Sequence, residues 1–198
     1  WSDRRRVLYA LEGTINGAAS ALAWFSETQG VDAQRMLADL NADAARGLRP
    51  PLFLNGVSGL GSPFWVPDFE SRFVGDGSAQ ECLLALLESI LFLIRVNLDE
   101  MRRAGTDLER VVVTGGLAAS DWLCQRLADL LSLRVQRYEE LEATARGLGF
   151  LVADQPAEWQ LAGKAREFVP VADSGLSERF CTWLKEMKHA VAAGSTVA

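Results

Sequence analysis

The sequence predicts an α/β domain in which helices flank a sheet. Three observations indicate this class. Apolar runs rich in β-branched residues, such as 110–114, alternate with segments whose apolar residues recur at helical spacing. The connections at 114–120 and 131–133 are short, as strand–helix units require. The 198 residues are 49% hydrophobic and 23% charged, which suits a folded chain with a substantial core.

Four elements are expected in the first part of the chain. The run VLYAL at 7–11 is short and apolar, which predicts a strand. Apolar residues then recur at helical spacing over 12–27 and again over 31–44, where Asp32 is the expected helix cap. Proline and glycine are frequent in 50–75, so this stretch predicts short strands joined by fixed turns.

A long helix is expected from about residue 78 to residue 103. Its middle, 82–96, is the most apolar stretch of the chain but contains Glu88, Ser89 and Arg95. A membrane-spanning helix needs about 20 predominantly apolar residues, and this stretch is too short and too polar to provide them. The pattern therefore predicts a buried helix of a folded domain, with Ser89 on its apolar side.

The remaining elements alternate between strands and helices. β-Branched residues and apolar periodicity predict a strand at 110–114, a helix at 120–131, a strand at 133–138 and helices at 142–154 and 173–193. Within the first of these strands, Val111, Val112 and Val113 follow one another without alternation. Such a run suits a strand that is covered on both faces, so we expect a central, buried strand there.

Charge, cysteine and histidine usage argue against several classes of function. The formal net charge is −6, whereas a general nucleic-acid binder needs a basic face. Cys82, Cys124 and Cys181 are widely spaced, which argues against a disulfide scaffold or a zinc site and favours the reducing cytoplasm. The sole histidine, His189, has no nucleophile motif before it, so we expect a surface residue rather than part of a hydrolytic triad.

The segment RVVVTGGLAASDW, residues 110–122, carries the main candidate site. Ligands of open α/β sheets bind beyond the carboxyl ends of strands, where helix N-termini direct free N–H groups. Gly115 and Gly116 occupy that place and, lacking Cβ atoms, let a ligand approach the backbone. Ser120 can cap the following helix and offer its hydroxyl to a ribose or a base. From these residues alone, a phosphate-binding surface and a plain turn are both open.

Five segments add a more specific pattern through their order and spacing. They are LEGTINGAASALAWF (11–25), NGVSGLGSPFWVPD (55–68), LLESILFLIR (86–95), VVVTGGLAASDWLCQRLADLL (111–131) and VQRYEELEATARGLGFLV (135–152). Together they resemble the C-terminal domain of the FGGY carbohydrate kinases, the family of glycerol kinase, xylulokinase and gluconokinase. The resemblance covers about residues 7 to 190, which is nearly the whole chain.

The resemblance implies a ribonuclease-H-like domain of the actin/hexokinase type, with a central mixed sheet flanked by helices. It implies that 1–198 is a single domain, the C-terminal nucleotide-binding lobe of a two-lobe kinase whose N-terminal lobe is not in this chain. The implied activity is ATP-dependent phosphotransfer to a hydroxyl of a sugar or polyol, with Mg²⁺ bridging ATP oxygens. By the same resemblance, Gly115 and Gly116 lie against the nucleotide phosphates and ribose, and Ser120 contacts the adenine.

Several features of the family pattern are absent from this chain. Thr114 stands where many relatives have aspartate. Ala19 and Ala23 align with a glycine and a glutamine near the nucleotide, so contacts from the first helix stay open.

The family's catalytic aspartate, a general base, and its phosphate-gripping G-T-G turn both lie upstream, so no catalytic residue and no metal ligand is assigned here. The alternative is an actin-like nucleotide-binding or interaction module without phosphoryl transfer. The particular substrate and any homo-oligomer are not indicated.

Overall fold

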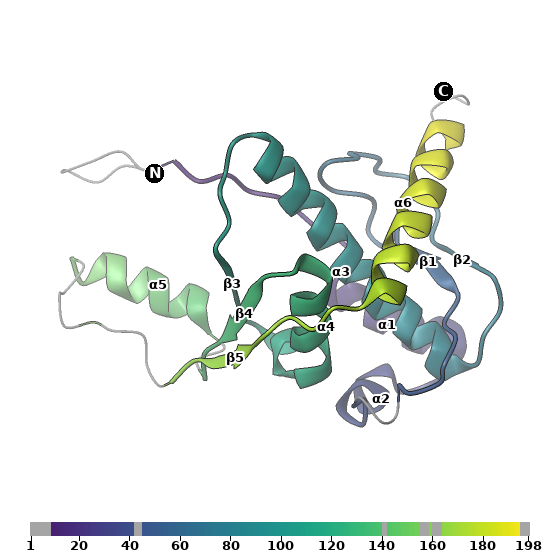
Figure 1. Ribbon diagram of the computed structural model, residues 1–198, viewed down its shortest axis with the longest axis horizontal. Helices are drawn as coiled ribbons and strands as arrows, with labels where there is room; N and C mark the ends of the chain where they lie inside the picture. The colour runs from purple at the N-terminus through teal and green to yellow at the C-terminus, as the bar shows by residue number, and fades with distance from the viewer. Residues whose placement is uncertain (1–8, 42–44, 140–141, 155–158, 160–163, 195–198) are drawn as a thin grey trace.

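The computed structural model describes residues 9–41, 45–139, 142–154, 159 and 164–194. Its helices are α1 (Ala19–Gln29), α2 (Ala33–Ala38), α3 (Ala79–Arg103), the 3₁₀ turn η1 (Gly116–Ala119), α4 (Asp121–Leu131), α5 (Ala143–Val152) and α6 (Ser174–Gly194). Its strands are β1 (Leu52–Leu54), β2 (Arg72–Val74), β3 (Arg110–Val113), β4 (Arg134–Arg137) and β5 (Arg166–Phe168). The long helix α3 lies in the middle, with β1 and β2 on one side and the other strands on the opposite side (Figure 1).

Helix α3 begins at a reciprocal cap. The Ser78 hydroxyl accepts a hydrogen bond from Glu81 N, and the Glu81 carboxylate accepts one from Ser78 N. Every residue over 82–93 is buried, and Ser89 within this run donates to the carbonyl of Leu86. The expected long buried helix is confirmed. Within the described ranges, every helix falls short of the length and apolar content that crossing a membrane needs.

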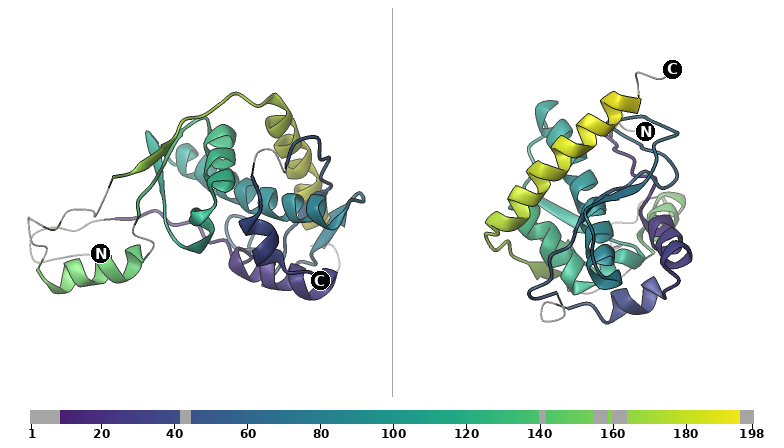
Figure 2. Two further views of the ribbon diagram at one scale, coloured as in Figure 1. Left: turned by 90° about the horizontal axis from the view of Figure 1, so that it is seen from below. Right: turned by 90° about the vertical axis from the view of Figure 1, so that its right-hand side faces the viewer.

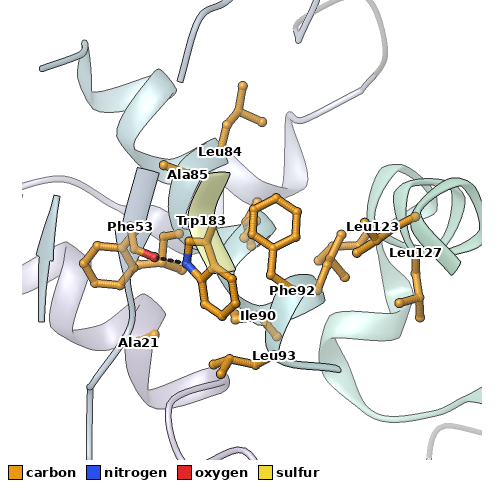
Figure 3. Packing of buried hydrophobic residues seen from close by; sticks show 14 of the residues in the cluster. Ala21, Phe53, Leu84, Ala85, Ile90, Phe92, Leu93, Leu123, Leu127 and Trp183 are labelled. Carbon is orange, nitrogen blue, oxygen red and sulfur yellow. Dashed lines mark hydrogen bonds between the residues drawn. The ribbon is translucent and has the colours of Figure 1, made fainter. Parts of the chain in front are cut away.

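Large, fully buried aromatic side chains from α3, α6 and β1 meet in the core. Trp183 on α6 is fully buried, and its indole nitrogen donates to the carbonyl of Phe53 on β1 at 2.8 Å (Figure 3). The Trp183 ring also lies 5.4 Å from the ring of Phe92 on α3, measured between centroids. The ring of Trp24 on α1 lies 5.2 Å from that of Phe53. Aromatic side chains of α1 and α6 therefore contact Phe53 of β1, and Phe92 of α3 extends this cluster through Trp183.

The second sheet has the order β3–β4–β5. Strands β3 and β4 run parallel, with Val111 opposite Val135, whereas β5 runs antiparallel to β4, with Phe168 opposite Val135. The sheet is therefore mixed, and α4 packs against it. Strand β5 was not expected, because its three residues, REF, are too few to show a periodic pattern.

The expectation of a central strand buried on both faces at 111–113 is wrong. β3 is at the edge of its sheet, and Val112 is 48% exposed. Val111 and Val113 pack against the core, whereas Val112 faces an apolar pocket of about 330 Å³ beside α5. Helix α5 buries none of its residues and stands away from the rest of the molecule (Figure 2), so it covers the second face of β3 only partly. The central strand is β4, where Val135 is fully buried.

The strand expected at 7–11 is not found in its described part. Val7 and Leu8 lie outside the described residues, and residues 9–11 belong to no strand of the part that the structure describes. Tyr9 is 94% exposed. An apolar run predicts a strand only where a partner strand or a core covers it, and neither lies against Tyr9 among the described residues.

The helix expected over 12–27 begins only at Ala19. The backbone before this helix is hydrogen-bonded to the loop that follows β1, because the Asn55 side chain donates to the Gly17 carbonyl at 2.7 Å. A Cβ atom on Gly17 would lie 2.6 Å from the carbonyl oxygen of Val57, so only glycine fits there. This close approach holds the chain out of the helical path until residue 19.

The other expected elements are confirmed with shifted ends. Asp32 caps α2 by accepting a hydrogen bond from Arg35 N at 3.0 Å. This helix ends at Ala38, and 42–44 of the longer expected helix lie outside the described residues. The proline- and glycine-rich stretch forms β1 and β2 joined by turns. Elements α4, β4, α5 and α6 have ends within two residues of those that apolar periodicity predicts.

Candidate functional site

The turn between β3 and α4 has the local structure that the sequence predicts. β3 ends at Val113, and Gly115 adopts φ +89°, a left-handed conformation that favours glycine. The turn η1 is closed by a hydrogen bond from Ala118 N to the Gly115 carbonyl at 3.0 Å. Ser120 ends the turn and caps α4, its hydroxyl accepting a hydrogen bond from Leu123 N at 3.3 Å. Strand, glycine pair and helix therefore follow in the expected order.

The outer side of this turn is open at both glycines. A Cβ atom added to Gly115 or Gly116 would meet no atom from elsewhere in the described chain within 4 Å. By contrast, an added Cβ would lie 2.3 Å from a carbonyl oxygen at Gly56 and 2.5 Å from one at Gly59, so packing requires those glycines. Gly115 is explained by its positive φ, but Gly116 is explained by neither packing nor a positive φ. The backbone at Gly116 is accessible to another molecule.

An open groove of about 1120 Å³ lies beside the turn. Its walls come from η1 and α4 on one side, from α2 and residues within 45–50 on another, and from β5. Gly116 and Ser120 line this groove, whereas Gly115 does not. Ala19 and Ala23 on α1 are exposed and do not line it. The structure thus brings together two of the three residues predicted for the site.

A charge network centred on the buried Glu88 contributes to the lining of the groove. Glu88 on α3 is 2% exposed and pairs with Arg126 on α4 at 2.9 Å and with Arg179 on α6 at 2.6 Å. Arg126 also pairs with Asp173. Burial by itself would lower the pKa of Arg126, but hydrogen bonds and charges from Glu88 and Asp173 outweigh it and raise that pKa. The network joins three helices and keeps a cation beside the groove.

One donor of this network has no partner among the described residues. The Nε atom of Arg126 is buried and makes no hydrogen bond, while the Arg126 side chain lines the groove. An unpaired buried donor costs about 1–3 kcal/mol relative to a paired one. Because Nε itself is buried, a ligand that lies in the groove does not reach this donor while the Arg126 side chain keeps its present conformation.

Sequence reasoning missed most of this network. It singled out Glu88 only as an interruption of an apolar stretch and did not select Arg126 or Arg179. These partners lie 38 and 91 residues from Glu88 along the chain, and no local pattern connects them. The available signal was the carboxylate itself, because a charge in an otherwise apolar helix needs a buried partner.

The three cysteines and the histidine do not contribute to the groove. Among the described residues, no three or more His, Cys, Asp or Glu side chains are grouped so as to hold a metal ion. Cys82 and Cys124 are free thiols, and burial raises the pKa of both. Cys181 is free and exposed, and His189 is exposed on α6, as expected. None of these four side chains lines the groove.

Most of the chain matches a known protein family. Residues 2–153 match the C-terminal domain of the FGGY family of carbohydrate kinases. The glycerol kinase of Allorhizobium ampelinum is 32% identical, and the match covers 96% of this chain and 41% of that protein. The glycerol kinase of Methylobacterium nodulans is 34% identical, and the match covers 86% of this chain and 37% of that protein. The chain thus spans about two fifths of the length of these relatives.

Solved structures agree on the fold. The gluconate kinase of Lactobacillus acidophilus matches with a TM-score of 0.69 at 17% identity, over 94% of this chain and 41% of that one. The glycerol kinase of Plasmodium falciparum, solved with ADP, matches with a TM-score of 0.68 at 18% identity, over 86% and 36%. The fold is that of the actin/hexokinase-like ATPases, with a mixed sheet flanked by helices. By the match over residues 2–153, this chain belongs to the FGGY family of carbohydrate kinases.

Proposed function

We propose that this chain is the C-terminal nucleotide-binding lobe of an ATP-dependent sugar or polyol kinase. The enzyme transfers the γ-phosphate of ATP to a hydroxyl of its substrate, and 1–198 acts as one domain beside a lobe that this chain does not contain. The observation that carries the proposal is Gly116, which faces the groove although neither packing nor a positive φ requires glycine there. Membership of the FGGY family supports the same chemistry.

In this proposal the nucleotide lies along η1 and the start of α4. The phosphates and the ribose approach the backbone of Gly115 and Gly116, where no Cβ atom obstructs them. The Ser120 hydroxyl accepts a hydrogen bond from Leu123 N and keeps its own proton for donation to the adenine. At about 1120 Å³ the groove has room for a nucleotide.

Phosphoryl transfer depends on alignment and charge stabilisation more than on covalent chemistry by the protein. To this chain we assign the alignment of the nucleotide. Mg²⁺, when bound, would neutralise part of the charge of the ATP phosphates. We assign the general base and the sugar or polyol to the lobe outside this chain.

We place the enzyme in the cytoplasm. Free cysteines fit a reducing compartment. A formal net charge of −6 provides no general basic face, so nucleic acid is not among the partners we propose. The acceptor class, a sugar or polyol, follows from relatives whose names are glycerol kinase and gluconate kinase.

A nucleotide titration followed by NMR tests the proposal, because chemical shifts report weak binding. The ¹⁵N-labelled chain is titrated with ADP and Mg²⁺, and we expect the amide signals of Gly115, Gly116 and Ser120 to move. Gly116→Val should raise the Kd for ADP at least about tenfold, which is 1.4 kcal/mol, because its branched side chain fills the space that the nucleotide needs. Gly147→Val is the matched control, since Gly147 is also open but lies outside the groove.

The outcomes separate the alternatives. Equal losses of affinity in the Gly116→Val and Gly147→Val chains would contradict the proposed site. No shift in any amide at millimolar ADP would favour an interaction module. The third outcome is that ADP binds at the turn but the longer protein that carries this chain transfers no phosphate to an acceptor. It would favour a nucleotide-binding module without phosphoryl transfer.

A further inference from the structure

One arginine holds the inner side of the turn between β3 and α4. Arg137, the last residue of β4, donates from Nη1 to the carbonyl oxygens of Ala118 at 2.8 Å and Ala119 at 3.1 Å. From Nη2 it donates to Oδ1 of Asp121 at 2.9 Å. A single guanidinium therefore reaches both the end of η1 and the first residue of α4.

Further contacts fix the position of Arg137. Its side chain is only 15% exposed, and its guanidinium carbon lies 5.4 Å from the centroid of the Phe168 ring on β5. Asp121 is held from a second direction by Arg166 on β5, at 2.8 Å. The planar group of Arg137 thus has partners along its edge and an aromatic ring against its face.

The turn makes few hydrogen bonds of its own. Backbone bonds within it run from Ala118 N to the Gly115 carbonyl at 3.0 Å and from Ser120 N to the Leu117 carbonyl at 3.2 Å. Two successive glycines give the backbone more conformational freedom than any other pair of residues. From outside the turn, the thiol of Cys124 donates to the Ala118 carbonyl at 3.3 Å, and Arg137 adds its two bonds to the carbonyls of Ala118 and Ala119. Contacts from outside therefore help to hold the turn in one conformation.

We propose that Arg137 is a positioning residue for nucleotide binding. By anchoring the carbonyls of Ala118 and Ala119, it keeps the outer side of the turn presented to the groove. Arg137 does not line the groove itself, so it acts through the turn rather than by touching the ligand. Only a planar, forked group reaches two carbonyls and a carboxylate at once, and the ammonium of lysine does not. This inference rests on the proposed function.

Two readouts on the whole 198-residue chain separate positioning from a purely structural role. Amide hydrogen exchange at Ala118 and Ser120 reports the turn without ligand, and titration with ADP and Mg²⁺ reports binding. We expect Arg137→Lys to speed exchange at these amides about tenfold and to raise the Kd for ADP by a similar factor, with α3 unchanged. Arg134→Lys is the matched control, an exposed arginine at the other end of β4, and should change neither readout.

Each result decides the proposal. An unchanged Kd for the Arg137→Lys chain, with normal binding by the unsubstituted chain, overturns the role of Arg137 and leaves the proposed function intact. ADP that moves no amide of the unsubstituted chain overturns the proposed function and, with it, the nucleotide role of Arg137. If the loss of ADP affinity is accompanied by a general loss of protection from hydrogen exchange in α3, Arg137 acts through the stability of the fold. That result overturns its role as a positioning residue.

A second variant covers the case in which the Arg137→Lys chain does not fold. Asp121→Asn alters a half-exposed residue and weakens one of the three bonds that orient Arg137. It should speed hydrogen exchange at Ala118 in the same direction as Arg137→Lys but by a smaller factor. Exchange is the deciding readout for this variant, because Asp121 itself lines the groove and its carboxylate acts on ADP directly. An Asp121→Asn chain that folds and shows unchanged exchange at Ala118 overturns the proposal.

Discussion

The buried Glu88 on α3 forms an ion pair with the partly exposed Arg179 on α6, in which Nε and Nη2 of the arginine lie 2.8 and 2.6 Å from one carboxylate oxygen. The same guanidinium donates to the carbonyl oxygens of Pro50 and Pro51 at 2.8 and 2.9 Å. It therefore connects the C-terminal helix both to α3 and to the segment before β1. Because Glu88, Arg179 and Pro50 all line the groove, the pair links the stability of the fold to the shape of the site.

Glu88→Leu should destabilise the chain by about 3–5 kcal/mol, because it leaves Arg126 and Arg179 without the negative charge that they share. Urea unfolding at neutral pH measures the change in the free energy of unfolding. The double variant Glu88→Leu with Arg179→Met should recover much of the loss, since well-packed apolar groups can replace a buried pair. Arg126 keeps Asp173 in that variant. A loss below about 1 kcal/mol in the single variant would mean that the pair behaves as a surface salt bridge.

Ser89→Asp should destabilise the chain by about 3–5 kcal/mol, because it places a charge at a fully buried position on α3. The native hydroxyl needs no distant partner, since it donates to the carbonyl of Leu86 at 2.6 Å on its own helix. Ser89→Ala is the control and should cost about 1 kcal/mol or less. Chemical denaturation of the three chains tests this, and a loss of only a few tenths of a kcal/mol for the aspartate would contradict the placement.

Sequence patterns were sufficient where the information is local. The long helix α3 follows from an apolar run that only Glu88, Ser89 and Arg95 interrupt. The burial of β3 was predicted wrongly because it depends on what covers each face of the sheet, and a run of valines does not encode that cover. Val111 packs against the core, whereas Val112 lies on the face that it shares with Gln136, and α5 covers that face only partly.

The same division holds at the site. Gly115 and Ser120 were identified because a strand end, a positive φ and a helix cap are properties of consecutive residues. Arg126 and Arg137 were not, because their roles come from partners brought together by the fold. Arg137 contacts Ala118 from the neighbouring parallel strand, 19 residues along the chain. The parallel pairing of β3 and β4 creates that contact, and the spacing of residues along the sequence does not predict it.

Acidification should weaken the cap of α3. A hydrogen bond from Arg49 N, and others from Ser78, lower the pKa of Glu81 from its ordinary value of 4.5. Because the folded pKa lies below the unfolded one, the stabilisation is present above about pH 4.5 and is lost as the pH falls through the folded pKa.

The difference in free energy of unfolding between the unsubstituted and Glu81→Gln chains measures this effect. We expect the difference to be constant from pH 7 down to about pH 5 and to shrink below that range. Glu27→Gln, on the exposed side of α1, controls for the removal of a carboxylate. A difference between the unsubstituted and Glu81→Gln chains that does not change between about pH 5 and pH 2 would contradict the role of Glu81.

The last prediction concerns the 198-residue chain by itself, which should fold, bind ATP weakly and transfer no phosphate. Folding follows from the continuous core that α3, α6 and β1 share, with Trp183 and Phe53 fully buried. Weak binding follows because Gly116 and Ser120 line an open groove, which offers a nucleotide contacts on only part of its surface.

Absence of transfer follows from the missing general base and from the lost alignment of an acceptor hydroxyl with the γ-phosphate. General acid–base catalysis contributes about 10²–10⁴-fold, and alignment contributes still more in reactions of this kind. The measurement is a coupled ADP-release assay with glycerol and a panel of pentoses and hexoses, run beside the longer protein that carries this chain. The absent base and the lost alignment together should lower the rate by more than about a hundredfold. Acceptor-dependent turnover by the chain alone at about one hundredth of the longer protein's rate would therefore overturn the division of roles between the lobes. Turnover that is absent without the second lobe and restored when it is supplied would place the base and the acceptor there.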